Sequence, residues 1–165
     1  METKKLHINT LDFAQKRHTM QGELLVCDLP RLQGVALDTS SGSLLHYRLE
    51  GETSALGLPG IRLQLDATLQ MVCQRCLGEV LLQLQLELGY VVSKDAPAEL
   101  DDMDELDWLE AEQNFDLTAL IEDELLLALP IAPVHDFPCN QHAMASGEKP
   151  NPFAILKGLK TDKAE

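Results

Sequence analysis

The sequence MVCQRCLGEV at residues 71–80 holds two cysteines separated by two residues, Cys73 and Cys76. Thiols at this spacing can bind one metal ion, exchange a disulfide, or lie without further chemistry at a tight turn. Gly78 follows the pair, as in a zinc knuckle, where a glycine lets the backbone turn under the metal. To choose between these three uses, we ask whether the chain offers further metal ligands and which secondary-structure elements flank the pair.

A second group of metal-ligating residue types lies far along the chain, in HDFPCNQH at 135–142. It offers Cys139 and His142, again separated by two residues. Because tetrahedral zinc takes four ligands, the candidate zinc site is Cys73, Cys76, Cys139 and His142. The second half lies in an irregular stretch, so the sequence favours a metal-free turn with two thiols. Bound zinc is the alternative, and no other cofactor is expected.

Long runs of alternating apolar and polar residues flank the cysteine pair. IRLQLDATLQM (61–71) and EVLLQLQLELGYVV (79–92) are apolar at every second residue, which is typical of half-buried antiparallel strands. They predict a hairpin with the cysteines at its tip. A thiol pair for disulfide exchange normally begins a helix, so the strand after Cys76 argues against redox chemistry. Shorter strand signals lie at 43–51, 23–28 and 33–38.

The segment FDLTALIEDELLLALP (115–130) predicts a helix with Asp116 as its N-cap and a proline at its end. Glu124 falls at the centre of the apolar face. A buried carboxylate needs a cation or hydrogen bonds, so we expect either that Glu124 reaches water at the edge or that it pairs internally with Arg17 or Arg75.

The net charge of −14 is concentrated in one part of the chain. Residues 95–147 contain 14 acidic side chains and no Lys or Arg, and 93–114 is expected to be an acidic mobile loop with a short helical piece around Trp108. Such a surface repels nucleic-acid backbones and attracts basic partners. The candidate acidic partner surface is Asp101, Asp102, Asp104, Glu105 and Asp107. The alternative is a solvated loop that only aids solubility.

Basic side chains gather near both termini and between the cysteines. The candidate contacts to RNA phosphates or to a partner are Lys16, Arg17, Arg75, Lys149, Lys157 and Lys160. The chain lacks the interleaved aromatic residues on which single-strand binders stack bases. The alternative is that these basic groups pair with the acidic segment or are simply solvated.

The sequence gives little support for an enzyme, a membrane protein or a secreted protein. There is no nucleophile-elbow, phosphate-loop, dinucleotide-binding or H-E-x-x-H motif, so an enzyme is not expected. No apolar run approaches the roughly 20 residues of a membrane span, and the first residues lack the pattern of a signal peptide. A cytoplasmic protein with no membrane partner is the resulting prediction.

Four segments together resemble the YceD family, the large ribosomal RNA subunit accumulation proteins. They are AQKRHTMQGEL, VCQRCLGEV, LIEDELLLALPIAPVHD and KPNPFAILKGLK, which follow in this order over nearly the whole chain. The resemblance implies a bacterial cytoplasmic protein that supports synthesis, processing or stability of 23S rRNA without enzymatic activity. Some relatives carry a second cysteine cluster toward the C-terminus. This chain departs from them, with Cys139 as the sole cysteine there and His135 and His142 nearby.

We therefore expect one α+β domain over residues 1–165. It should hold an antiparallel sheet or partly closed β-barrel with a long central hairpin, one packed helix and a short C-terminal helix, with an irregular loop at 131–150. The expected function is that of a non-enzymatic ribosome-biogenesis factor. Its partners would be large-subunit rRNA, directly or indirectly, and a basic large-subunit ribosomal protein or assembly factor. The alternatives are a zinc- or thiol-dependent enzyme, or a module that binds a basic ribosomal protein without RNA contact.

Overall fold

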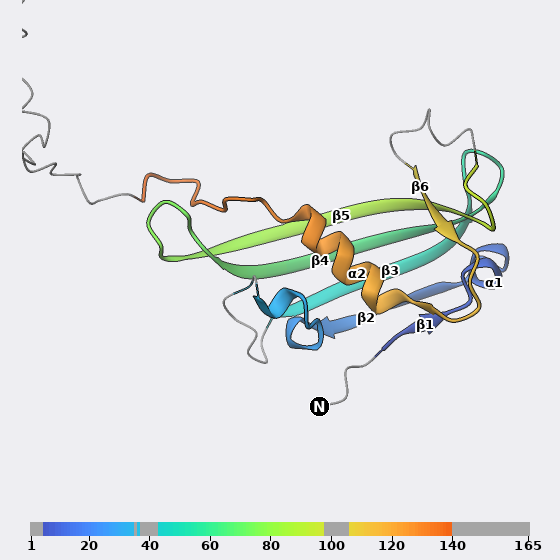
Figure 1. Cartoon of the computed structure of the whole chain (residues 1–165), viewed down its shortest axis with the longest axis horizontal. Coiled ribbons are helices and arrows are strands. Elements are labelled where there is room, and N and C mark those ends of the chain that lie inside the picture. The colour runs from blue at the N-terminus through green and yellow to red at the C-terminus, as the bar shows by residue number, and fades with distance from the viewer. Residues whose placement is uncertain (1–4, 35, 37–42, 98–105, 140–165) are drawn as a thin grey trace, which may run out of the picture.

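The computed structural model describes residues 5–34, 36, 43–97 and 106–139. Its main element is a five-stranded sheet, which Figure 1 shows face on. The spatial order is β2 (Thr19–Leu25), β3 (Leu44–Thr53), β4 (Pro59–Val72), β5 (Glu79–Ser93) and β6 (Leu106–Glu110). Strands β2 to β5 pair antiparallel and β6 runs parallel to β5. The sheet stays open, with β2 and β6 as its edges, so the α+β prediction is confirmed in its open-sheet form.

The predicted central hairpin is the pair β4 and β5. Their register aligns Leu63 with Leu88 and Met71 with Val80, so the apolar residues of both strands share one face. Along β4 the burial alternates as the sequence does, and Leu63, Leu65 and Ala67 are buried. The alternation therefore positions the cysteine pair at the far end of the hairpin, beyond the main core.

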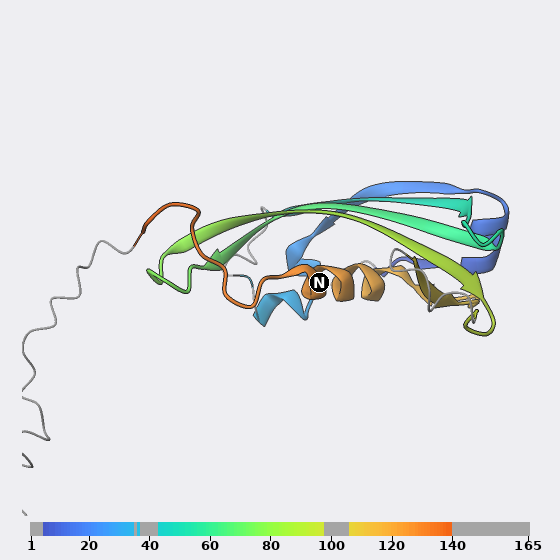
Figure 2. The ribbon, with the colours of Figure 1, turned by 90° about the horizontal axis from the view of Figure 1, so that it is seen from above.

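Helix α2 (Leu117–Ala128) covers the buried face of this sheet (Figure 2). Asp116 is its N-cap, and its side chain accepts a hydrogen bond from the backbone N–H of Ala119 at 3.0 Å. Leu117, Ile121 and Leu125 repeat every four residues and are 0% exposed, because they pack onto the leucines of the strands. The predicted helix is confirmed.

The partner expected for Glu124 is wrong. Its side chain is half-buried and accepts a hydrogen bond from the Tyr90 hydroxyl at 2.8 Å, whereas Arg17 donates to Thr53. The buried carboxylate of α2 is Glu122, which is 5% exposed and accepts from the backbone N–H of Arg31. The helical periodicity of the sequence placed Glu124 at the centre of the apolar face. In the structure, the fully buried row is Leu117, Ile121 and Leu125, and Glu122 lies closer to the core than Glu124 does.

Several short elements differ from the sequence expectations. Trp108 lies in strand β6 and not in a helical piece, because Leu109 is buried and the Trp108 indole N–H donates to Ser93. The strand signal at 23–28 is confirmed over 23–25, the end of β2, and is followed by the 3₁₀ turn η1 (Val26–Asp28). The signal at 33–38 begins in the 3₁₀ turn η2 (Leu32–Gly34), and its residues 35, 37 and 38 lie outside the described residues. The sequence also missed α1 (Thr10–Gln15) and the pair formed by β1 (His7–Ile8) and β7 (Phe115–Asp116).

Some predictions fall outside the described residues. They are the C-terminal helix, His142, the lysines Lys149, Lys157 and Lys160, and the acidic residues Asp101, Asp102, Asp104 and Glu105. Within the described part of the chain, no helix has the length and apolar character needed to cross a membrane.

Candidate metal centre

The turn between β4 and β5 directs both cysteines of the pair toward one point. The Cys73 N–H donates to Gly78 O at 2.8 Å, and the Leu77 N–H donates to Cys73 O at 2.9 Å. Leu77 closes the turn in the left-handed region, with a φ of 60°. Cys73 is thereby 0% exposed and Cys76 half-buried.

The segment after α2 runs back to this turn, as Figure 1 shows. The Gln74 N–H donates to Pro133 O at 2.8 Å. The Arg75 guanidinium donates to His135 O at 2.7 Å and also to Phe137 O. These bonds join two segments that are about sixty residues apart in sequence and bring His135 and Cys139 beside the cysteine pair.

Four potential ligand atoms converge here, from Cys73, Cys76, His135 and Cys139, and all lie within 4.8 Å of one another. The Sγ atoms of Cys73 and Cys139 are 3.7 Å apart, and Cys76 Sγ is 3.6 Å from His135 Nδ1. Zn–S bonds of about 2.3 Å and Zn–N bonds of about 2.0 Å in a tetrahedron place ligand atoms roughly 3.5–3.8 Å apart. The donor set and its spacing therefore fit a zinc ion.

His135 is oriented by its second ring nitrogen. Its Nε2 lies 2.8 Å from Glu79 O, a carbonyl that can only accept, so Nε2 carries the proton of that bond. The neutral imidazole then presents the Nδ1 lone pair toward Cys76. A backbone carbonyl that fixes the tautomer of a ligand is a common outer-shell partner of zinc-binding histidines.

The local electrostatics favour the thiolate at two of the three cysteines, Cys73 and Cys139. Burial raises the pKa of Cys73, but the backbone N–H groups of Cys76, Arg75 and His135 outweigh it and lower the pKa to about 5. Burial likewise raises the pKa of Cys139, but the hydrogen bond from Arg75 and the neighbouring His135 ring lower it overall. The Gly78 backbone N–H lowers the pKa of Cys76, but burial and the neighbouring thiols leave it raised. Thiolates are the form that binds metals.

The part of the chain that contains this site matches a known protein family. The model of the family described as "Large ribosomal RNA subunit accumulation protein YceD" matches residues 61–160, which include the hairpin, α2 and all four ligand residues. The chain belongs to the YceD family. A curated relative from Haemophilus influenzae (strain ATCC 51907 / DSM 11121 / KW20 / Rd), named Large ribosomal RNA subunit accumulation protein YceD, is 28% identical over 170 residues. The alignment covers 94% of this chain and 95% of the relative. No solved structure matches.

The described cluster of this YceD chain holds three of the four predicted ligands. Cys73, Cys76 and Cys139 come together as the sequence proposed, and His135 is the histidine of the described cluster. His142 lies outside the described residues. The spacing alone could not choose between two histidines that flank one cysteine. His135 lies in the cluster because hydrogen bonds hold residues 133–137 against the hairpin turn.

The three described residues among those predicted to contact RNA, Lys16, Arg17 and Arg75, have internal partners. Lys16 lies 2.7 Å from the Asp12 carboxylate, and Arg17 donates to Thr53 at 3.3 Å. Arg75 donates from Nε to Cys139 Sγ at 3.0 Å, in addition to its two carbonyl bonds. In the described part of the YceD fold, Arg75 therefore positions the ligand loop and is not a free cation.

We predict that Arg75→Gln weakens zinc binding by about 10- to 100-fold, the usual cost of losing an outer-shell partner. The glutamine amide cannot supply the positive charge beside Cys139 or reach both carbonyls. Competition with a chromophoric chelator measures the affinity. The neighbouring Gln74→Ala, which keeps the backbone bond to Pro133, is the control and should bind as the wild type does. Equal affinities for both variants would show that Arg75 plays no such role.

Proposed function

We propose that this chain is a non-enzymatic cytoplasmic factor that supports the accumulation of 23S rRNA, with a structural zinc ion in the hairpin tip. The family match over residues 61–160 carries the proposal, because the matched region contains the central hairpin, α2 and the ligand cluster. The name shared by the family and its Haemophilus relative describes accumulation of the large ribosomal RNA subunit.

A structural zinc is the better choice over a catalytic one. Four protein ligands fill a tetrahedral shell, whereas a catalytic zinc keeps one position open for water or substrate. Three thiolates, one neutral imidazole and Zn²⁺ give the centre a charge of about −1. The Arg75 guanidinium beside Cys139 offsets this charge. The zinc ion, when bound, would hold the segment after α2 to the hairpin tip.

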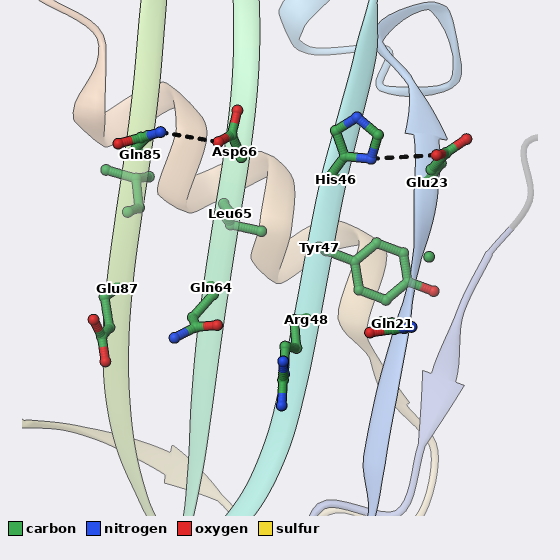
Figure 3. A pocket seen from close by; sticks show the side chains of 12 residues that line it. Gln21, Glu23, His46, Tyr47, Arg48, Gln64, Leu65, Asp66, Gln85 and Glu87 are labelled. Carbon is green, nitrogen blue, oxygen red and sulfur yellow. Dashed lines mark hydrogen bonds and ion pairs between the residues drawn. The ribbon is translucent and has the colours of Figure 1, made fainter.

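The open face of the sheet offers no evident catalytic group either. It carries a shallow hollow of about 660 Å³ across β2 to β5, shown in Figure 3. Cross-strand pairs line it: His46 Nδ1 lies 3.3 Å from Glu23, and Gln85 donates to Asp66 at 3.0 Å. Both members of the His46–Glu23 pair are more than half exposed, which is typical of a solvated sheet face.

We infer that the action on rRNA is indirect, through a basic protein. Most basic side chains of the described residues already lie beside carboxylates. The ion pairs are Lys5–Asp116, Lys16–Asp12, Arg31–Asp123, Arg48–Glu50 and Arg62 with Glu52 and Glu87. With a net charge of −14, such a surface repels phosphates and attracts cationic protein segments.

The proposed role is tested in cells from which the gene has been deleted. The ratio of 23S to 16S rRNA should fall, and the wild-type gene supplied in trans should restore it. An unchanged ratio in the deletion cells would contradict the function. Crosslinking RNA to the protein in cells then separates direct from indirect action, because indirect action predicts little crosslinked 23S rRNA.

The acidic partner surface makes a separate prediction. Changing Asp101, Asp102, Asp104, Glu105 and Asp107 to their amides should weaken capture of a basic large-subunit ribosomal protein, more so at low salt. Amides are preferable to deletion, because deletion of residues 95–113 would remove strand β6 and the buried Leu109. The control converts Glu23, Glu50, Glu52, Asp66 and Glu87, which lie on β2 to β5, to amides. If both variants capture the protein as well as the wild type, the partner surface lies elsewhere.

A further inference from the structure

Large apolar side chains are exposed along the chain from the end of α2 to the hairpin turn. Leu127 is 80% exposed, Ile131 104%, Val134 46% and Phe137 60%, and Leu77 in the turn is 76% exposed. We call these five residues the tip surface. They follow the path of the chain from the end of α2 to the hairpin turn (Figure 1), where the bonds from Gln74 and Arg75 hold the two segments together. Where exposed apolar side chains adjoin one another, they mark interaction sites.

Prolines and hydrogen bonds restrict the backbone that carries most of the tip surface. Pro130, Pro133 and Pro138 restrict the backbone of the segment, and Pro133 is buried. The ring of Phe137 lies 4.7 Å from that of His135, one of the candidate zinc ligands. A preorganised surface of this kind costs little conformational entropy on binding, which raises affinity for a given contact area.

The charges around the tip surface indicate the chemistry of its partner. Residues 117–139 contain no Lys or Arg. The carboxylates of α2 are engaged within the fold: Glu122 is buried, Asp123 pairs with Arg31, and Glu124 accepts from Tyr90. Glu79 and Asp136 are exposed close to the turn. The cation of the turn itself, Arg75, has its donors on Cys139 and on two carbonyls. An apolar surface with an acidic surround complements a segment that is apolar on one face and cationic on the other.

We propose that the tip surface binds a cationic amphipathic segment of a partner protein. Leu127, Ile131 and Phe137 contact its apolar face, and Glu79 and Asp136 attract its Lys or Arg residues. The inference rests on the proposed function only in that both name a basic protein partner. The apolar contacts are a feature of this surface that the acidic segment at 95–113 does not share.

The direct test measures the binding of a fluorescent helical Leu/Lys peptide to the zinc-loaded full chain by anisotropy. The triple variant Leu127→Ser, Ile131→Ser, Phe137→Ser should bind about tenfold or more weakly, since interface anchors carry most of the binding energy. The matched control is Leu44→Ser with Leu81→Ser, which are 42% and 69% exposed on β3 and β5 and should bind as the wild type does. A peptide of the same composition without helical periodicity should bind more weakly. Equal affinity of the triple variant and the wild type would overturn the proposal.

A second measurement distinguishes other occupants of the surface. Photoreactive benzoylphenylalanine in place of Ile131 should crosslink to the Leu/Lys peptide. A crosslink to a second copy of the chain, or to residues 140–165 of the same chain, in place of the peptide would overturn the proposal. These assays use purified protein, so their failure would leave the rRNA ratio in deletion cells as an independent test of the proposed function.

Discussion

Cys73→Ser is expected to abolish stoichiometric zinc binding. Cys73 is 0% exposed, and its Sγ lies 3.7 Å from that of Cys139, so a serine hydroxyl there can neither reach nor replace the thiolate. Losing a ligand should exceed the about 10- to 100-fold cost of losing an outer-shell partner. Metal analysis of the purified protein measures the stoichiometry. Cys27→Ser is the control, because Cys27 lies outside the ligand cluster and should leave one zinc per chain.

The same variant also tests whether the metal stabilises the fold. A ligand present at 100 times its Kd stabilises the native state by about 2.7 kcal/mol, which corresponds to roughly 5–10 °C in Tm for a chain of this size. A chelator should therefore lower the Tm of the wild type by about that amount and leave Cys73→Ser unchanged. Wild-type protein that contains no zinc after purification in zinc-supplemented medium would refute the metal centre.

Ile121→Ala is expected to cost the largest amount of stability among single substitutions in α2. Ile121 is 0% exposed in the main core, between Leu117 and Leu125. Removing buried methyl and methylene groups there should lower the free energy of unfolding by about 2–5 kcal/mol. Urea denaturation followed by circular dichroism measures the change.

Leu127→Ala is the matched control on the same helix. Leu127 is 80% exposed, so its truncation should change the free energy of unfolding by no more than about 0.5 kcal/mol. Similar losses for Ile121→Ala and Leu127→Ala would mean that α2 does not pack on the sheet through the Leu117–Ile121–Leu125 row.

The sequence predicted the long elements because each contains enough residues to show a regular repeat of apolar positions. β4, β5 and α2 each repeat one apolar pattern over many residues, and all three are present. β6 is only five residues long and lies in an acidic stretch, so its single buried Leu109 carried too little signal. The two-residue strands β1 and β7 show no period at all and depend on pairing across the chain.

The candidate site was predictable in part for a related reason. The spacing of Cys73, Cys76 and Cys139 indicated that these thiols could share one site, although the sequence favoured a metal-free turn. The sequence could not identify His135 as the histidine of the described cluster, because that depends on bonds from Gln74 and Arg75 to carbonyls about sixty residues away. The internal role of Arg75 was hidden for the same reason, since an exposed arginine beside cysteines also suits RNA contact.

We propose that a hairpin tip ordered by zinc serves the accumulation of large-subunit rRNA. The most direct measurement is the ratio of 23S to 16S rRNA in deletion cells that carry Cys73→Ser or Gln74→Ser, expressed at equal protein levels. Gln74→Ser keeps the backbone bond to Pro133 and should restore the ratio, whereas Cys73→Ser should leave it low. Full restoration by Cys73→Ser would contradict the account.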